Sequence, residues 1–291
     1  MYQPLIKFHP HPAIITQVLR IFVKTNTNNM LRLLLLLCSV ALSTLCCVAN
    51  NRAGKIVSVE SEGMTRRALV YAPPSQQSAA PLVFVFHGRG GDMHAVSQKI
   101  DIHKHWHEAI VVYPQGMWGE GRYREGFGWV IPSGEEEGRD IRFFDDLLKY
   151  LLENYDVDRQ NIYAAGHSNG SVFTHALWAL RGELFRGFMT SSAGSAMLRA
   201  NATKRVPKPV FIIGGVEDEL VKIEGIRREI EKVKQLNGCT THCKFSKSVT
   251  LYQGVDGADV AVVIHPSGHA FQSSLVPEIV EFFKYVQKKQ R

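Results

Sequence analysis

Cysteine is scarce in this sequence, and most of it lies near the amino terminus. Of five cysteines in 291 residues, only Cys239 and Cys243 come after residue 50. They flank His242 in a C-x3-C pattern, but the chain has no second cluster to complete a tetrahedral metal shell, so we predict no metal site. In a secreted chain the two thiols would pair, and we expect a local disulfide rather than two free thiols.

Internal repeats, low-complexity tracts and basic stripes interleaved with aromatic residues are also lacking. The formal charge of +7 is inflated by residues 1–49, which contain four basic side chains and no acidic one. Without them, 30 basic side chains face 27 acidic ones. This excess is too small to indicate a nucleic-acid partner, and we predict none.

One leucine-rich run, residues 33–49, follows Arg32 and ends in small residues. This order of regions is typical of a secretory signal peptide, with Met30 as a natural start. We expect cleavage after Ala49, secretion, and no stable membrane association afterwards. Because the run is about the minimum that spans a bilayer, a retained anchor is the alternative. In a eukaryotic secretory pathway, Asn201 in Asn-Ala-Thr would be a glycosylation site.

Short apolar runs alternate with helical patterns along the rest of the chain. Six runs have the length and composition of buried strands: residues 82–86, 110–113, 161–165, 188–191, 210–213 and 258–264. Helices are predicted over five segments: residues 95–108, 139–154, 171–180, 222–236 and 277–288. An antiparallel hairpin precedes them around Gly63, and residues 115–138 are expected to form a long surface loop. This alternation predicts one α/β domain over residues 50–291, with a mostly parallel sheet covered by helices on both faces.

The stretch 161–180, NIYAAGHSNGSVFTHALWAL, places a G-x-S-x-G pattern between a strand and a helix. This is the context of a nucleophile elbow, a tight turn that raises a serine hydroxyl above the sheet. Gly166 and Gly170 fit it because a side chain at either position would collide with the neighbouring strand and helix. We therefore predict Ser168 as a nucleophile and the Asn169 N–H as a donor to an oxyanion.

A serine hydroxyl needs a base, and in α/β hydrolases an acid and then a histidine follow the serine along the chain. Asp218 comes after the strand at 210–213 and a glycine turn, so we predict it as the acid. Its neighbour Glu217 is the alternative, and both carboxylates would also suit a helix cap. His269, between the last strand and the last helix, is the predicted base, with His265 as the alternative.

The string His-Gly-Arg-Gly-Gly, residues 87–91, follows the third predicted strand directly. The second oxyanion donor usually comes from this loop, where glycines let the backbone approach a substrate carbonyl. We predict the Arg89 N–H as that donor, with Gly88 and Gly90 as alternatives. Trp129, with Phe127, is expected to wall a substrate pocket, although a buried anchor for the loop is an equal alternative.

Eight motifs in order resemble the secreted α/β hydrolases related to polyhydroxybutyrate depolymerases and to feruloyl or acetylxylan esterases (carbohydrate esterase family 1). They are LVYAPP, PLVFVFHGRGG, VVYPQG, RDIRFFDDLLKYL, YDVDRQNIYAAGHSNG, GGVEDELV, NGC and SGHAF. The resemblance spans residues 69–283 and implies the α/β-hydrolase fold. It also implies that Ser168, Asp218 and His269 occupy the catalytic triad positions.

The chain departs from this family's pattern in three places, one of which is Ser171, where many relatives have another glycine. The aromatic-proline segment that borders the acyl pocket in relatives is replaced by Ala-Phe-Gln-Ser, so Phe271 is the expected pocket residue and specificity does not carry over. The family's cysteine after Asn-Gly is Cys239, but its usual partner is absent near residues 252–254, where Cys243 would be the substitute.

Together these patterns predict a secreted serine esterase that needs no metal or organic cofactor. Its expected substrates are feruloyl or acetyl esters of plant cell-wall polysaccharide, or short hydroxyalkanoate esters. A general short-chain carboxylesterase or a peptidase is an alternative, since a triad does not fix the acyl group. A catalytically silent hydrolase-fold protein that binds a carbohydrate or a partner is an alternative of another class.

Overall fold

The computed structural model describes residues 54–74, 78–120, 125–130, 138–194 and 205–289. The chain divides into residues 1–51 and a second unit, Arg52–Arg291, to which all the described residues belong. The predicted signal peptide and the predicted glycosylation site at Asn201 lie outside the described residues and stay predictions.

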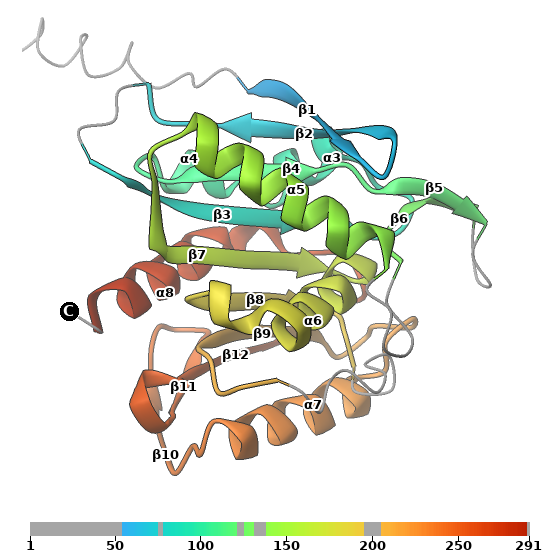
Figure 1. Ribbon diagram of the computed structural model, residues 1–291. Helices are drawn as coiled ribbons and strands as arrows, with labels where there is room; N and C mark the ends of the chain where they lie inside the picture. Colours follow the sequence, from blue (N-terminus) through green and yellow to red (C-terminus); the bar gives the residue numbers. More distant parts are fainter. Residues whose placement is uncertain (1–53, 75–77, 121–124, 131–137, 195–204, 290–291) are drawn as a thin grey trace, which may run out of the picture. The chain divides into compact units, whose positions relative to one another are not determined.

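A ten-stranded sheet forms the centre of the second unit, in the order β1-β2-β4-β3-β7-β8-β9-β12-β11-β10 (Figure 1). The strands are β1 Lys55–Ser61, β2 Met64–Tyr71, β3 Ala80–Phe86, β4 Ile110–Pro114, β7 Val157–His167, β8 Gly187–Ser191, β9 Val210–Gly215, β10 Thr241–Lys244, β11 Thr250–Gln253 and β12 Val260–His265. The six strands from β4 to β12 run parallel, while β1 and β2 form the predicted antiparallel hairpin at one edge. The predicted α/β-hydrolase class of fold is confirmed.

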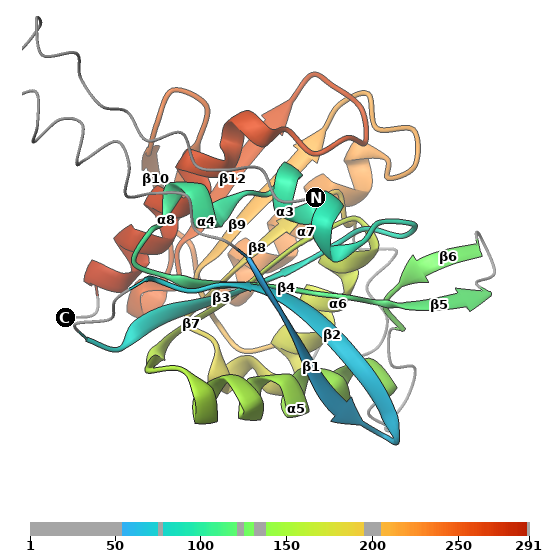
Figure 2. The same ribbon diagram turned by 90° about the horizontal axis from the view of Figure 1, so that it is seen from above.

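Helices cover both faces of the sheet (Figures 1 and 2). They are α3 Met93–Lys99, α4 Ile102–His105, α5 Arg139–Asn154, α6 Asn169–Arg181, α7 Ile223–Leu236 and α8 Val276–Lys289, with short 3-10 turns at Gly182–Leu184, Val255–Gly257 and Ser273–Leu275. Residues of α5, α6 and α7 join one core cluster, and residues of α3, α4 and α8 join the other. The sheet therefore separates two hydrophobic cores.

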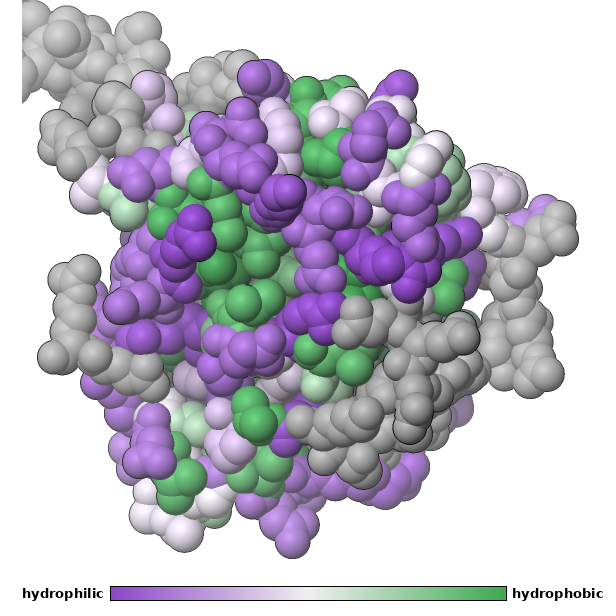
Figure 3. All heavy atoms as spheres, in the orientation of Figure 1, coloured by the Kyte–Doolittle hydropathy of each residue, from purple (hydrophilic) through white to green (hydrophobic). Residues whose placement is uncertain are grey.

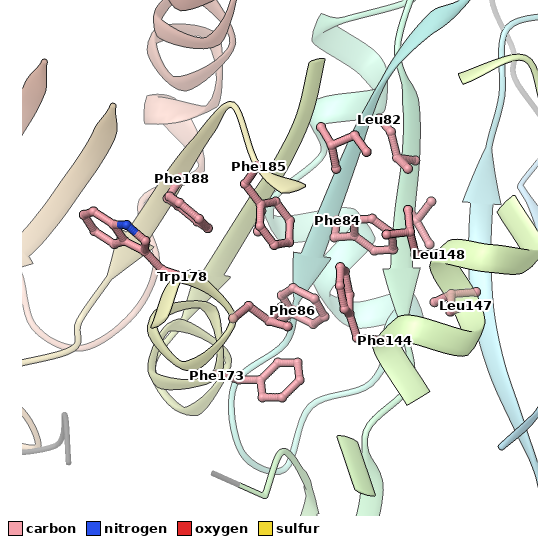
Figure 4. Packing of buried hydrophobic residues seen from close by; sticks show 14 of the residues in the cluster. Leu82, Phe84, Phe86, Phe144, Leu147, Leu148, Phe173, Trp178, Phe185 and Phe188 are labelled. Carbon is pink, nitrogen blue, oxygen red and sulfur yellow. The ribbon is translucent and has the colours of Figure 1, made fainter. Parts of the chain in front are cut away.

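The alternation of side chains along β3 explains why this strand is wholly apolar. Leu82, Phe84 and Phe86 point into the first core, where they pack with aromatic residues of α5 and α6 (Figure 4). Val83 and Val85 point into the second core on the opposite face. Because successive side chains on a strand face opposite ways, a strand buried on both faces has no polar positions.

Three features of the described elements differ from the sequence prediction. The helix predicted over 95–108 is two short helices, because Ile100 leaves the helical region with φ −114° and ψ 63°. The loop predicted over 115–138 contains the hairpin of β5 Met117–Glu120 and β6 Glu125–Gly128. A second hairpin, β10–β11, extends the sheet at the edge opposite β1.

The face of the molecule over α5 and α6 is mostly hydrophilic, with apolar side chains gathered near its middle (Figure 3). In the part of the chain that the structure describes, no helix combines the length and apolar character needed to cross a membrane.

Candidate active site

Ser168 lies at the junction of β7 and α6 in a strained backbone conformation. Its φ is 54° and its ψ is −120°, in a region that L-amino acids rarely occupy. Such strain costs about 1 to 3 kcal/mol and persists only where the surrounding structure enforces it. Here β7 and α6 hold the turn from both sides, and the Ser168 N–H donates to Ser191 O at 2.8 Å.

The two glycines of the pattern are required by close backbone contacts. A Cβ atom on Gly166 would lie 2.4 Å from Gly170 O, and one on Gly170 would lie 2.2 Å from Phe86 O. Neither neighbour is a flexible side chain, so any larger residue would force the strand and the helix apart. The predicted strand, elbow and helix are therefore all observed around Ser168.

Ser168, His269 and Asp218 come together from three separate segments of the chain. His269 Nε2 lies 2.9 Å from Ser168 Oγ, and His269 Nδ1 lies 2.8 Å from Asp218 Oδ2 and 3.0 Å from Asp218 Oδ1. Because a carboxylate only accepts hydrogen bonds, Nδ1 carries the proton and Nε2 is left free to accept one from the serine. This is the arrangement of a serine–histidine–acid triad.

Asp218 is held as a carboxylate by the donors around it. Burial acts to raise the pKa of Asp218, but hydrogen bonds from the Val221 N–H and from His269 outweigh burial, so the pKa lies below its ordinary value. The Leu220 N–H is a further donor, at 2.9 Å from Oδ1. The alternative acid, Glu217, is exposed. Among the described residues, the alternative base, His265, forms no hydrogen bond with Ser168 or Asp218.

The two predicted oxyanion donors lie on segments that adjoin Ser168, the first turn of α6 and the loop after β3. Asn169 is the first residue of α6, and the first intrahelical bond runs from Val172 N–H to Ser168 O, so the Asn169 N–H belongs to the open first turn. In the loop after β3, the Gly90 N–H donates to Phe127 O at 2.7 Å, which removes Gly90 from the alternatives. Among the described residues, no acceptor is found for the Arg89 N–H.

Trp129 is a core residue, so the prediction that it walls a substrate pocket is wrong. Its side chain is 1% exposed, stacks on Phe173 at 5.1 Å between ring centroids, and donates from Nε1 to His87 O at 2.9 Å. Trp129 is thus the buried anchor of its loop. Burying the indole removes a large apolar area from water, which favours the inward orientation.

Phe271 is likewise buried rather than on an open pocket wall. It is 8% exposed, belongs to the second core and meets the His167 ring edge-on at 6.0 Å. His167 in turn lies 5.0 Å from the His269 ring, between centroids, and its Nδ1 is 3.1 Å from Ser191 Oγ. Burial, followed by the nearby His269, lowers the pKa of His167 to about 3.

The predicted disulfide between Cys239 and Cys243 is wrong, since both are free thiols. Cys239 packs against the first core, with its Sγ 3.9 Å from Tyr252 O. Cys243 is exposed on the edge strand β10. The two side chains therefore sit in different environments, one turned to the core and the other to solvent.

The exposed aromatic residues beside the site lie on the hairpin β5–β6, which the sequence analysis treated as a loop. Trp118 is 58% exposed and Phe127 is 38% exposed, and their rings meet edge-to-face at 5.3 Å. The bond from the Gly90 N–H to Phe127 O ties this hairpin to the loop after β3. Of the two aromatic residues predicted to wall a pocket, Phe127 is therefore exposed and Trp129 is buried. Contact between Phe127 and a substrate stays a prediction.

Comparisons with known proteins give the site its context, although no known family profile matches the chain. Feruloyl esterase D of Neurospora crassa is 24% identical over 241 residues, covering 75% of this chain and 78% of that protein. A bifunctional acetylxylan esterase/xylanase of Neocallimastix patriciarum is 22% identical over 61% of this chain, which spans 25% of that protein. The solved acetyl xylan esterase of Aspergillus awamori has a TM-score of 0.58 at 15% identity, covering 80% of this chain and all of that one.

The mostly parallel sheet and the structural neighbours show that the fold is the α/β-hydrolase fold. The relatives with sequence similarity to this chain are feruloyl and acetylxylan esterases, which supports a carboxylic ester hydrolase.

Proposed function

We propose that this chain is a secreted serine esterase that removes feruloyl or acetyl groups from plant cell-wall polysaccharide through an acyl-enzyme on Ser168. The observation that carries the proposal is the continuous hydrogen-bonded chain from Ser168 through His269 to Asp218 on a strained elbow. The names of the relatives, feruloyl esterase and acetylxylan esterase, support the substrate class.

In the proposed reaction, Ser168 Oγ attacks the ester carbonyl carbon while His269 Nε2 takes the serine proton. The tetrahedral intermediate collapses when the imidazolium gives that proton to the leaving alcohol. Water then attacks the acyl-enzyme, again with His269 as base, and releases the acid and the free serine. Asp218 keeps the imidazole in the tautomer with Nδ1 protonated and offsets its charge when it becomes a cation.

The developing oxyanion is stabilised in this proposal by the N–H groups of Asn169 and Arg89. Each donor of this kind contributes about 10² to 10³-fold to the rate, because it is already oriented when the charge forms. Asn169 is well suited, since the amino-terminal end of α6 adds the positive end of the helix dipole to its N–H. No metal or organic cofactor enters any step.

The Trp118–Phe127 pair supports an aromatic acyl group, or a sugar ring beside it, as the ligand of the hairpin. Both rings are exposed, and their hairpin is bonded to the loop that offers Arg89. Stacking on such rings favours planar or apolar ligand faces, so a feruloyl group fits better than a bare acetyl group. Trp118→Ala should therefore lower kcat/KM for methyl ferulate more than for an acetyl ester of similar alcohol.

A panel of soluble esters tests the proposal against a silent binding protein. Protein beginning at Asn50 is assayed with methyl ferulate, acetylated xylan oligomers and hydroxybutyrate oligomers, beside Ser168→Ala. Hydrolysis that disappears in Ser168→Ala supports an esterase. The alternative outcome is a folded protein that hydrolyses none of these esters and binds xylan oligomers equally well with and without the serine hydroxyl. That result would identify a carbohydrate-binding protein.

Secretion is the part of the proposal that rests on sequence alone. Expression of the full chain in a eukaryotic secretory host, followed by amino-terminal sequencing of the medium, tests it directly. Mature protein starting at Asn50 is expected, and chain retained with the membrane fraction would favour the anchor.

A further inference from the structure

We propose that His87 is a positioning residue for the oxyanion hole: its imidazole holds the Gly88 carbonyl so that the Arg89 N–H is presented to the substrate. This inference rests on the proposed function, since it concerns the hole beside Ser168. It assigns a role to a buried side chain that touches neither the nucleophile nor the base.

The contacts of His87 define which ring nitrogen carries its proton. The Gly116 N–H, which can only donate, points to Nε2 at 2.9 Å, so Nε2 is an acceptor. Nδ1 lies 2.8 Å from Gly88 O, which can only accept, so Nδ1 carries the hydrogen. The ring is 1% exposed, and burial lowers the pKa of His87, which favours this neutral form.

The hydrogen bonds to Gly88 O determine where the Arg89 N–H points. Gly88 O accepts from His87 Nδ1 and from the Gly91 N–H, the latter at 3.1 Å. The described chain has no cis peptide bond, and in a trans peptide the C=O and the following N–H point in opposite directions. Fixing Gly88 O on one side therefore turns the Arg89 N–H to the other. Gly90, with φ 77°, completes this tight turn.

The loop that contains this peptide lies next to the nucleophile. A Cβ atom on Gly88 would be 3.4 Å from Ser168 Cβ and 3.4 Å from His167 O, so the loop packs directly against the elbow. If the Gly88–Arg89 peptide turned over, a carbonyl oxygen would replace the N–H beside the reacting carbon. That oxygen would repel the oxyanion instead of stabilising it. His87 opposes this rotation from inside the fold.

Two substitutions of similar shape separate positioning from simple core packing. In His87→Asn, the side-chain amide N–H can occupy the place of Nδ1–H and still donate to Gly88 O. In His87→Leu, a branch of the same shape carries no donor. We expect His87→Leu to lower kcat about 10²-fold, the effect of losing one oxyanion donor, with KM within about twofold of wild type. His87→Asn should recover most of that loss.

A second readout follows the oxyanion itself. A trifluoromethyl ketone that adds to Ser168 places a charged oxygen in the hole, so its affinity should fall in His87→Leu in proportion to kcat. An equal loss of kcat in His87→Leu and His87→Asn, with KM and thermal stability changing together, would mean that His87 only fills space. That result would overturn the proposal. Wild-type activity in folded His87→Leu would overturn it as well.

Nitrogen-15 NMR of wild-type protein tests the same inference without any catalysis. A proton on Nδ1 of His87 and an unprotonated Nε2 are expected, and the opposite tautomer would contradict the proposal. This result stands even if His87→Leu fails to fold. Wild-type protein that shows the expected tautomer but hydrolyses no ester would refute the proposed function and leave the orientation of the peptide intact.

Discussion

The side-chain amide of Asn169 forms two hydrogen bonds with the backbone of Trp129. Asn169 Oδ1 accepts from the Trp129 N–H at 2.7 Å, and Asn169 Nδ2 donates to Trp129 O at 3.1 Å. The residue that offers its own N–H to the proposed oxyanion hole thus also fastens the segment after β6 to the start of α6. The two segments are in close contact, since a Cβ atom on Gly128 would lie 2.8 Å from Asn169 Oδ1.

Asn169→Ala should weaken both stability and catalysis. It leaves the N–H and C=O of Trp129 without these partners, which costs about 1 to 3 kcal/mol of unfolding free energy. Loosening of the first turn of α6 should reduce kcat/KM as well. Urea denaturation and ester kinetics measure the two effects. Asn154→Ala is the control, because the Asn154 side chain is exposed and, within the described part of the chain, donates to Tyr150 O alone. If Asn169→Ala had the same unfolding free energy and kcat/KM as that control, the two hydrogen bonds to Trp129 would have no energetic role.

Ser168→Gly should give a more stable but inactive protein. Glycine adopts a φ of 54° without the steric cost that serine meets there. We expect a gain of about 1 kcal/mol in unfolding free energy, part of the 1 to 3 kcal/mol that such strain costs. Ser168→Ala keeps the Cβ atom and should show no such gain, although it is equally inactive. Equal stability of the two variants in urea denaturation would argue against strain at the elbow.

Buried His167 should make the fold sensitive to acid. Its pKa, lowered to about 3 mainly by burial, lies below the value of about 6.5 expected in the unfolded chain. Between those values the unfolded chain binds a proton that the folded chain excludes, so stability falls as the pH drops from about 6.5 towards 3. His167→Gln should lose less stability than wild type between about pH 7 and pH 4.5, measured by urea midpoints.

The exposed His107 provides the control for that experiment. His107→Gln should follow the wild-type loss of stability, because its side chain lies in water in both states. Identical pH dependence of the His167 and His107 variants would contradict the role assigned to His167.

The buried ion pair between Arg66 and Asp140 should be essential to the loop that carries Trp129. Arg66 Nη2 lies 2.9 Å from Asp140 Oδ1, and Asp140 Oδ2 accepts from the Val130 N–H at 2.7 Å. Arg66→Met leaves the buried Asp140 carboxylate with the more distant Arg139, whose Nε lies 3.7 Å from Oδ2, and should cost about 3 kcal/mol.

The exposed pair of Arg142 and Glu62 offers a matched comparison for Arg66. Arg142→Met should cost at most about 1 kcal/mol, since water screens the charges there. Thermal or urea unfolding of the two variants side by side tests the difference. Similar losses in both would mean that burial does not decide the strength of the Arg66 pair.

The triad geometry was predictable because each of its parts has a local signature. Ser168 lies in a strand–glycine–helix pattern, and Asp218 and His269 each follow a buried strand at the carboxyl edge of a parallel sheet. The periodicity over Arg139–Asn154 likewise gave the bounds of α5 directly. Such signals involve neighbours in the chain, so one sequence suffices to recognise them.

The errors concern burial and contacts between distant segments. Whether Trp129 faces a pocket or the core depends on Phe173 and His87, which are far from it in the chain. Cys239 and Cys243 are close in sequence but differ in environment, because one packs on the core and the other lies on an edge strand. The hairpin β5–β6 escaped prediction because its strands are short and contain glycines, which lower strand propensity.

The most direct test of the central claim is to treat protein beginning at Asn50 with a fluorophosphonate probe and to map the modified peptide by mass spectrometry. A single adduct on Ser168, abolished in His269→Ala and strongly reduced in Asp218→Asn, is the result that an activated triad predicts. Absence of any adduct in well-folded protein, or an adduct that persists in His269→Ala, would contradict a nucleophile activated by His269.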